Sequence, residues 1–131
     1  MEIYNISVIT DKRTQLLDIT KIIGDFILKS PIADGLCLVY SPHTTTGIII
    51  NEAYDSDVAF DINLFLNNLV PKNNSYRHTE GNSDAHIKAS IIGNSRMLPY
   101  SGNKFNLGKW EGIFLCEFDG PRQRNINLIL I

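Results

Sequence analysis

The hydrophobic and polar positions of this chain follow two different spacings, and these predict both strands and helices. Residues 2–9 alternate between apolar and polar side chains with one irregular step, which predicts a first strand. From Asp18 onward the apolar residues recur three and four positions apart, as on one face of a helix, until Ser30 and Pro31 end the run. We therefore expect a strand over 2–9 and a helix over 18–29, with Asp18 as its N-cap.

The middle of the chain continues with two apolar stretches and a second helical spacing. Residues 36–41 and 45–50 are rich in aliphatic side chains and poor in charges, as is typical of strands buried on both faces. Between 56 and 70 the apolar residues again fall at helical offsets, and Pro71 stops the pattern. Two buried strands followed by an amphipathic helix are therefore expected here.

The last part of the chain predicts one more helix followed by sheet. Ser83 or Asp84 is a good N-cap, and Ala85, Ala89 and Ile92 recur at helical spacing. The remaining patterns predict strands over 95–100, 104–107, 112–118 and 122–131, separated by turns rich in glycine, asparagine and proline.

Together the elements predict a single domain over residues 1–131, because this length supports one hydrophobic core and not two. The expected fold class is α+β: a mixed, largely antiparallel β-sandwich or half-barrel with helices packed against it. No internal repeat, low-complexity tract or linker interrupts the pattern.

Charge and composition narrow the choice of partners. The net charge of −2 and the absence of a basic stripe argue against nucleic acid as a partner. No apolar run approaches the length of a membrane span, and the first residues do not have the pattern of a secretory signal, so we expect a cytoplasmic protein with no membrane partner. Cys37 and Cys116 lie inside apolar segments and are expected to be buried, reduced thiols.

Three histidines, from three separate segments, are the first candidates for chemistry. His43 lies at the junction of two predicted strands, while His78 and His86 flank a turn that leads into the third helix. Three imidazoles can hold Zn²⁺ and leave one position open for water or substrate. No His-Glu-x-x-His or paired Cys-x-x-Cys motif supports this, so a metal site, an anion site and purely structural histidines all remain open.

A second group of charges follows the predicted strand 112–118. Glu117 and Asp119 would share one face of an extended segment, as would Arg122 and Arg124 after the turn. Carboxylates suit Mg²⁺, and the planar fork of arginine suits phosphate or carboxylate groups. The alternative is an exposed hairpin held by weak surface salt bridges.

Five stretches of the chain also read together as one family signature. They are Ser41-Pro42-His43-Thr44-Thr45, Ile50-Asn51-Glu52, the segment from His78 to Ala89, Gly108-x-Trp110, and the segment from Glu117 to Arg124. In this order, and over nearly the whole chain, they resemble the YjbQ family, also called uncharacterised protein family 0047 or the secondary thiamine-phosphate synthase family. The resemblance implies a compact, sandwich-like α+β fold that forms a homotrimer with pockets near the subunit interfaces. It also implies a weak ability to join a pyrimidine pyrophosphate to a thiazole phosphate, which makes thiamine phosphate.

Carried over residue by residue, the resemblance implies the site residues His43, Glu52, His78, Asp84, His86, Glu117 and Arg122. Three functions then compete. In a transferase, Mg²⁺ held by Glu52, Asp84 or Glu117 neutralises the leaving pyrophosphate, a histidine assists proton transfer, and phosphate oxygens are bound by Lys88, Arg122 and Arg124. In a metallohydrolase, Zn²⁺ is held by His43, His78 and His86. In a non-catalytic binding module, the same pocket captures a phosphorylated or otherwise anionic small molecule.

Overall fold

The structure, a computed structural model, describes all residues from 1 to 131 and contains eight strands and three helices. In chain order the elements are β1 (Glu2–Ile9), β2 (Gln15–Asp18), α1 (Thr20–Leu28), β3 (Gly35–Tyr40), β4 (Thr46–Glu52), α2 (Ser56–Leu69), α3 (Ser83–Ile92), β5 (Ser95–Ser101), β6 (Lys104–Phe105), β7 (Glu111–Glu117) and β8 (Gln123–Leu130).

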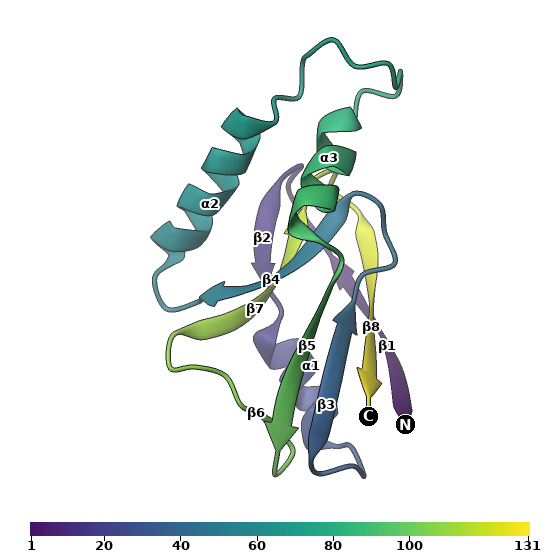
Figure 1. Cartoon of the computed structure of the whole chain (residues 1–131), viewed down its shortest axis with the longest axis vertical. Helices are drawn as coiled ribbons and strands as arrows, with labels where there is room; N and C mark the ends of the chain where they lie inside the picture. The colour runs from purple at the N-terminus through teal and green to yellow at the C-terminus, as the bar shows by residue number, and fades with distance from the viewer.

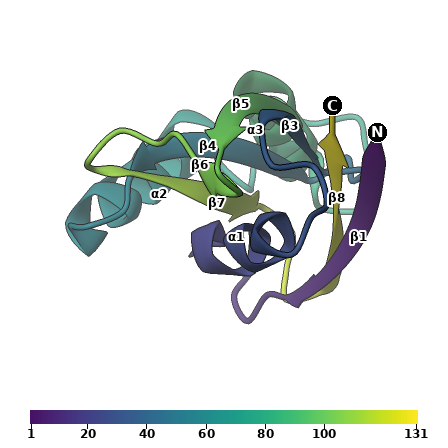
Figure 2. The same cartoon turned by 90° about the horizontal axis from the view of Figure 1, so that it is seen from below.

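The strands form two antiparallel sheets. The larger has the order β1-β8-β3-β5-β6, and the smaller has the order β2-β7-β4. Figure 2, seen from below, shows the larger sheet curving around α1 on two sides, with β7 along a third. This arrangement confirms the expected α+β half-barrel.

Helix α1 fills the curve of the sheet. Ile19, Ile23 and Ile27 are fully buried and belong to the main core cluster with side chains from both sheets. The helix begins at Thr20, two residues later than predicted. The N-cap position is held by Ile19 and not by Asp18, so that prediction was wrong by one residue; Asp18, just before it, accepts hydrogen bonds on Oδ1 from the backbone N–H and the hydroxyl of Thr20 at 2.9 Å and 2.6 Å.

Helix α3 lies tightly against β4. A Cβ built on Gly47 would lie 2.6 Å from Cγ2 of Ile92 and 3.0 Å from the backbone oxygen of Gly93, so only glycine permits this approach. The backbone N–H of Ile48 donates to the same Gly93 oxygen at 3.0 Å. These contacts fix α3 relative to the smaller sheet.

Some predicted elements differ from the structure. Strand β2, which has only four residues and pairs with β7, was not predicted. The stretch 36–41 is not buried on both faces as predicted. Cys37 and Val39 on one face are fully buried, whereas Leu36 on the other face is 43% exposed. The expected strand 104–107 is reduced to Lys104–Phe105.

Four connections gather at one end of the molecule, at the top of Figure 1: the β1–β2 turn, the β3–β4 loop, the segment before α3, and the β7–β8 turn. Backbone hydrogen bonds tie them together. The backbone N–H of Phe118 donates to the backbone oxygen of Thr45 at 3.2 Å, and that of Gly120 donates to the backbone oxygen of Arg13 at 2.9 Å. Most of the predicted site residues lie on these connections or on α3.

None of the three helices combines the length and the apolar character needed to cross a lipid bilayer.

Candidate functional site

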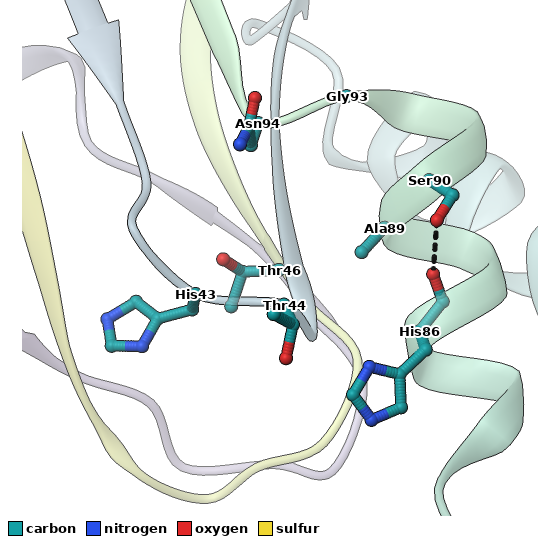
Figure 3. A pocket seen from close by; sticks show the side chains of 8 residues that line it. All are labelled: His43, Thr44, Thr46, His86, Ala89, Ser90, Gly93 and Asn94. Atoms are coloured by element: carbon teal, nitrogen blue, oxygen red, sulfur yellow. Dashed lines mark hydrogen bonds between the residues drawn. The ribbon is translucent and has the colours of Figure 1, made fainter.

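Two adjoining cavities run along α3 and share His43, Thr44 and His86. The larger, about 460 Å³, is completed by Thr46, Ala89, Ser90, Gly93 and Asn94 (Figure 3). The smaller, about 380 Å³, is completed by Pro42, Thr45, Glu80, Asn82, Asp119, Arg122 and Arg124. We call these two cavities together the α3 cleft. It brings together four of the predicted site residues, namely His43, His86, Arg122 and Arg124.

His43 is held as a neutral imidazole. Its Nε2 accepts a hydrogen bond from the backbone N–H of Asn125 at 2.9 Å, so the ring proton resides on Nδ1. Burial and the nearby Arg124 guanidinium lower the pKa of His43. In this conformation the ring can donate a hydrogen bond to an oxyanion but has no free lone pair for a metal or a proton.

Glu117 and Arg124 form a buried ion pair under the cleft. Arg124 donates from Nε to Glu117 Oε1 at 2.9 Å and from Nη2 to Oε2, and its Nη2 also reaches the Thr45 hydroxyl at 2.8 Å. Thr10 and the backbone N–H of Asp119 donate to the same carboxylate at 2.7 Å and 3.1 Å. Burial alone would raise the pKa of Glu117, but the hydrogen bonds from Arg124 and Thr10 outweigh it, so that pKa lies below its usual value. Glu117 therefore acts as a structural anion that positions the β7–β8 turn.

Arg122 lies at the mouth of the cleft, where Asp119 orients it. Its Nε donates to the Asp119 backbone oxygen at 2.7 Å, and its Nη2 donates to the Asp119 carboxylate at 2.9 Å. Asn82 donates to that carboxylate as well, at 2.9 Å, while its own Oδ1 is buried and has no partner. These bonds leave Nη1 of Arg122 and the Asn82 carbonyl for a ligand.

The other two histidines meet each other but do not join His43. The rings of His78 and His86 lie edge to face with centroids 5.3 Å apart, and His78 Nε2 is 3.7 Å from a Glu80 carboxylate oxygen. Figure 3 shows the His43 ring pointing away from α3, on which His86 lies. His78 lines a neighbouring cavity of about 330 Å³ and not the α3 cleft. The geometry of a single chain therefore does not support the predicted three-histidine set.

Asp84 and Lys88 lie on the opposite face of α3 from His86. Both are almost completely buried, and the Lys88 ammonium is 3.3 Å from Asp84 Oδ2. Arg13 grips the same carboxylate with two hydrogen bonds, at 3.0 Å and 3.1 Å. Burial alone raises the pKa of Asp84, but the Arg13 hydrogen bonds outweigh it and hold that pKa below its usual value. Neither side chain lines the α3 cleft, in contrast to the prediction of one common site.

Glu52 lies outside the site altogether. It ends β4 opposite Glu111 of β7, beside the start of α2 and away from the first turn of α3 (Figure 1). It lines none of the four principal cavities.

The residues do not fit the expected Mg²⁺ site. Of the three predicted carboxylate ligands, Asp84 and Glu117 are each saturated by a guanidinium, and Glu52 is remote. No group of three or more histidine, cysteine, aspartate or glutamate side chains within the chain is arranged to hold a metal ion. For Zn²⁺ the nearest set is His78, His86 and Glu80, which would need a further ligand or a rearrangement.

Several polar residues of the cleft were not predicted as site residues, among them Thr44, Thr45, Asn82 and Ser90. Asn82 belongs to the long motif between His78 and Ala89, and that motif was the one signal that could have identified it.

Comparison with known proteins gives a consistent result. A family model described as "UPF0047 protein YjbQ-like" matches residues 4–131. UPF0047 protein MJ1081 of Methanocaldococcus jannaschii is 49% identical over 122 residues, which cover 93% of this chain and 88% of that protein. UPF0047 protein YugU of Bacillus subtilis is 42% identical over 116 residues, which cover 88% of each chain.

Solved structures agree with the sequence relatives. An uncharacterised protein of the YjbQ/UPF0047 family from Clostridium acetobutylicum superposes with a TM-score of 0.94 at 43% identity, covering 98% of this chain and 99% of that one. A hypothetical protein from Aeropyrum pernix gives a TM-score of 0.95 at 35% identity, covering 100% of this chain and 98% of that one.

Proposed function

Because the chain belongs to the YjbQ-like UPF0047 family, we propose that it binds a phosphorylated small molecule in the α3 cleft and joins a pyrimidine pyrophosphate to a thiazole phosphate with release of pyrophosphate. The choice of these two substrates rests on the family resemblance. The observation that carries the anion-binding part is the convergence of two oxyanion donors, Arg122 and the neutral His43, on one cleft, beside Asn82 at the N-cap of α3.

Each donor suits a phosphate oxygen for a different physical reason. Arg122 is pre-oriented by Asp119 and keeps Nη1 for a ligand. The N-terminus of α3 starts next to Asn82, which lines the cleft, and the positive end of a helix favours a nearby anion. The Nδ1–H of His43 adds a donor without adding a charge.

The proposed reaction breaks the bond between the pyrimidine methylene carbon and a pyrophosphate oxygen, and the oxygen keeps the electron pair. The thiazole nitrogen then uses its lone pair to form the new carbon–nitrogen bond. Negative charge grows on the departing pyrophosphate, which Arg122 and the Nδ1–H of His43 stabilise. His86, at the junction of the two cavities, supplies a proton to the leaving group.

The test is to measure pyrophosphate binding and thiamine-phosphate formation in wild type, Arg122→Ala and His86→Ala. We expect Arg122→Ala to weaken pyrophosphate binding by about tenfold or more, because it removes a charged hydrogen-bond donor. His86→Ala is expected to lower turnover more than binding.

Lys104→Ala is the matched control, since Lys104 is exposed on β6 at the opposite end of the molecule (Figure 1). If neither cleft variant differs from this control in either assay, the cleft is not the site. If both lose pyrophosphate binding but no variant, nor wild type, forms thiamine phosphate, the chain is the non-catalytic anion-binding module or uses another substrate.

A second candidate function is a metal-dependent hydrolase, which the contact between His78 and His86 beside Glu80 favours. It predicts that chain purified without chelators carries Zn²⁺ in stoichiometric amount, and that His78→Ala removes it. Equal metal content in His78→Ala and wild type would refute this candidate.

We also propose that the chain assembles as a homotrimer. The number of subunits rests on the family resemblance, and the need for a partner is supported by α2, whose outer side exposes Phe60, Leu64, Phe65 and Leu69 by 48% to 66%. Light scattering should give the mass of three chains, and Phe65→Asp should lower it, whereas Lys104→Asp on β6, away from α2, should not. A monomer at micromolar concentration would refute the trimer.

A further inference from the structure

A third polar cavity lies on the other face of α3 and takes no part in the function proposed above. It has a volume of about 180 Å³ and is lined only by polar side chains, namely Arg13, Thr14, Asn67, Lys72, Asp84 and Lys88. They come from the β1–β2 turn, the end of α2 and the following loop, and α3. We call it the Lys88 cavity.

The charges around the Lys88 cavity do not balance. Three cationic side chains face one carboxylate, that of Asp84. Arg13 already binds both oxygens of this carboxylate, at 3.0 Å and 3.1 Å, whereas Lys88 is 3.3 Å from one of them. The shortest bond of the Lys88 ammonium, 2.6 Å, goes to the neutral side-chain oxygen of Asn67. The cavity therefore carries surplus positive charge.

The part of this charge that Lys88 carries is buried, which makes it costly without a further anion. Lys88 is 1% exposed, and burial lowers its pKa despite the neighbouring Asp84. An ammonium has three donor hydrogens, and only two of those of Lys88 have an acceptor in the chain. The ammonium also lies 5.9 Å from the centre of the Phe118 ring, and an anion in the cavity would give it a third and stronger acceptor.

Thr14 supplies another donor to the same space. Its hydroxyl oxygen accepts hydrogen bonds from the side-chain amides of Asn63 and Asn67, at 3.3 Å and 3.1 Å. With both acceptor positions filled, its own hydrogen is left to donate. The polar hydrogens of Thr14 and Lys88, together with the cationic heads of Arg13 and Lys72, thus border one small space.

We propose that the Lys88 cavity binds a phosphate group, coordinated by Arg13, Lys72 and Lys88. The volume corresponds to roughly six water molecules at about 30 Å³ each, which admits one tetrahedral oxyanion. The ligand is either inorganic phosphate or the phosphate end of a monoester. Because Asp84 and Lys88 point from α3 away from the α3 cleft, the inference is independent of the reaction proposed there.

Calorimetric titration of the intact protein with inorganic phosphate tests the site. Arg122→Ala serves as the background, so that binding in the α3 cleft is weakened. Lys72 is exposed, and its replacement by glutamate leaves the buried network intact. We expect Lys72→Glu in this background to weaken phosphate binding by about tenfold or more, and the control Lys104→Glu to leave it unchanged.

Repeating the titration with phenyl phosphate separates the two sources of the phosphate group. If inorganic phosphate binds and phenyl phosphate does not, the ligand of the Lys88 cavity is free phosphate. If both compounds bind and both depend on Lys72, the cavity accepts the phosphate end of a monoester. The proposal is overturned if neither compound binds the Arg122→Ala protein at millimolar concentration, or if Lys72→Glu and Lys104→Glu bind them equally.

Discussion

Replacing Glu117 by glutamine should destabilise the chain far more than its small change in shape suggests. The carboxylate accepts four hydrogen bonds: Oε1 from Thr10 and from Nε of Arg124, Oε2 from Nη2 of Arg124 and from the N–H of Asp119. In either orientation, a glutamine amide would lose two of these bonds and turn its own N–H groups toward other donors. It would also leave the guanidinium of Arg124, 4% exposed, without its counter-ion.

Breaking one side of a buried ion pair typically costs about 3–5 kcal/mol. We expect a loss of that size in the free energy of unfolding of Glu117→Gln at pH 7, measured by urea denaturation. The matched control is Asp25→Asn, which removes the exposed pair between Lys21 and Asp25 on α1. Surface pairs of this kind contribute about 0.3–0.5 kcal/mol, so the control should be nearly silent.

The pH dependence gives an independent check. The folded pKa of Glu117 lies below its unfolded value of about 4.3, so the stabilisation is complete above that pH and is lost as the pH falls through the folded pKa. The difference in unfolding free energy between wild type and Glu117→Gln should therefore be constant near neutrality and shrink below about pH 4. A loss at pH 7 no larger than that of Asp25→Asn would refute this reasoning.

Two further predictions concern packing and thiol chemistry. Gly24→Ala should raise the free energy of unfolding by about 0.5–1 kcal/mol, because a Cβ there meets no atom within 4 Å and alanine favours a helix. Gly112→Ala should instead lower the free energy of unfolding by about 1–3 kcal/mol, because its Cβ would lie 2.4 Å from that of Ala53. Urea denaturation of both variants checks the pair, and equal signs would contradict it. Burial raises the pKa values of Cys37 and Cys116 to about 12, so neither thiol should react with iodoacetamide at pH 8 in the folded chain, while both should in denaturant; intact mass shows the difference.

The helices were predictable because each shows its buried face within a single stretch of sequence. The apolar spacing around Ile23 and Ile27 is visible without any knowledge of the sheet that covers them. Strand β2 was not predictable in this way, because four residues are too few to show a period and its pairing with β7 joins segments about 100 positions apart.

The grouping of residues in the candidate site was predictable in part, for equally physical reasons. Motifs in the sequence grouped His43, His86 and Arg122 as candidate site residues, and all three line the α3 cleft. They could not indicate which charges neutralise each other. Asp84 is bound by Arg13, which lies 71 residues earlier in the sequence. Because of this pairing, Asp84 belongs to a buried network of charges and does not act as the metal ligand that was expected. Only the tertiary structure supplies that information.

One error could have been avoided from the sequence, and it explains why α3 serves two cavities. Successive residues of a helix are about 100° apart, so residues two positions apart lie on nearly opposite faces, whereas residues four positions apart share a face. Asp84 and Lys88 therefore face one side of α3, and His86 and Ser90 face the other. Gly47 lets the same helix lie close against β4, so both faces are held by one rigid element. Because Asp84 and Lys88 alternate with His86 and Ser90 along this short helix, α3 presents polar side chains to two separate cavities, one on each side.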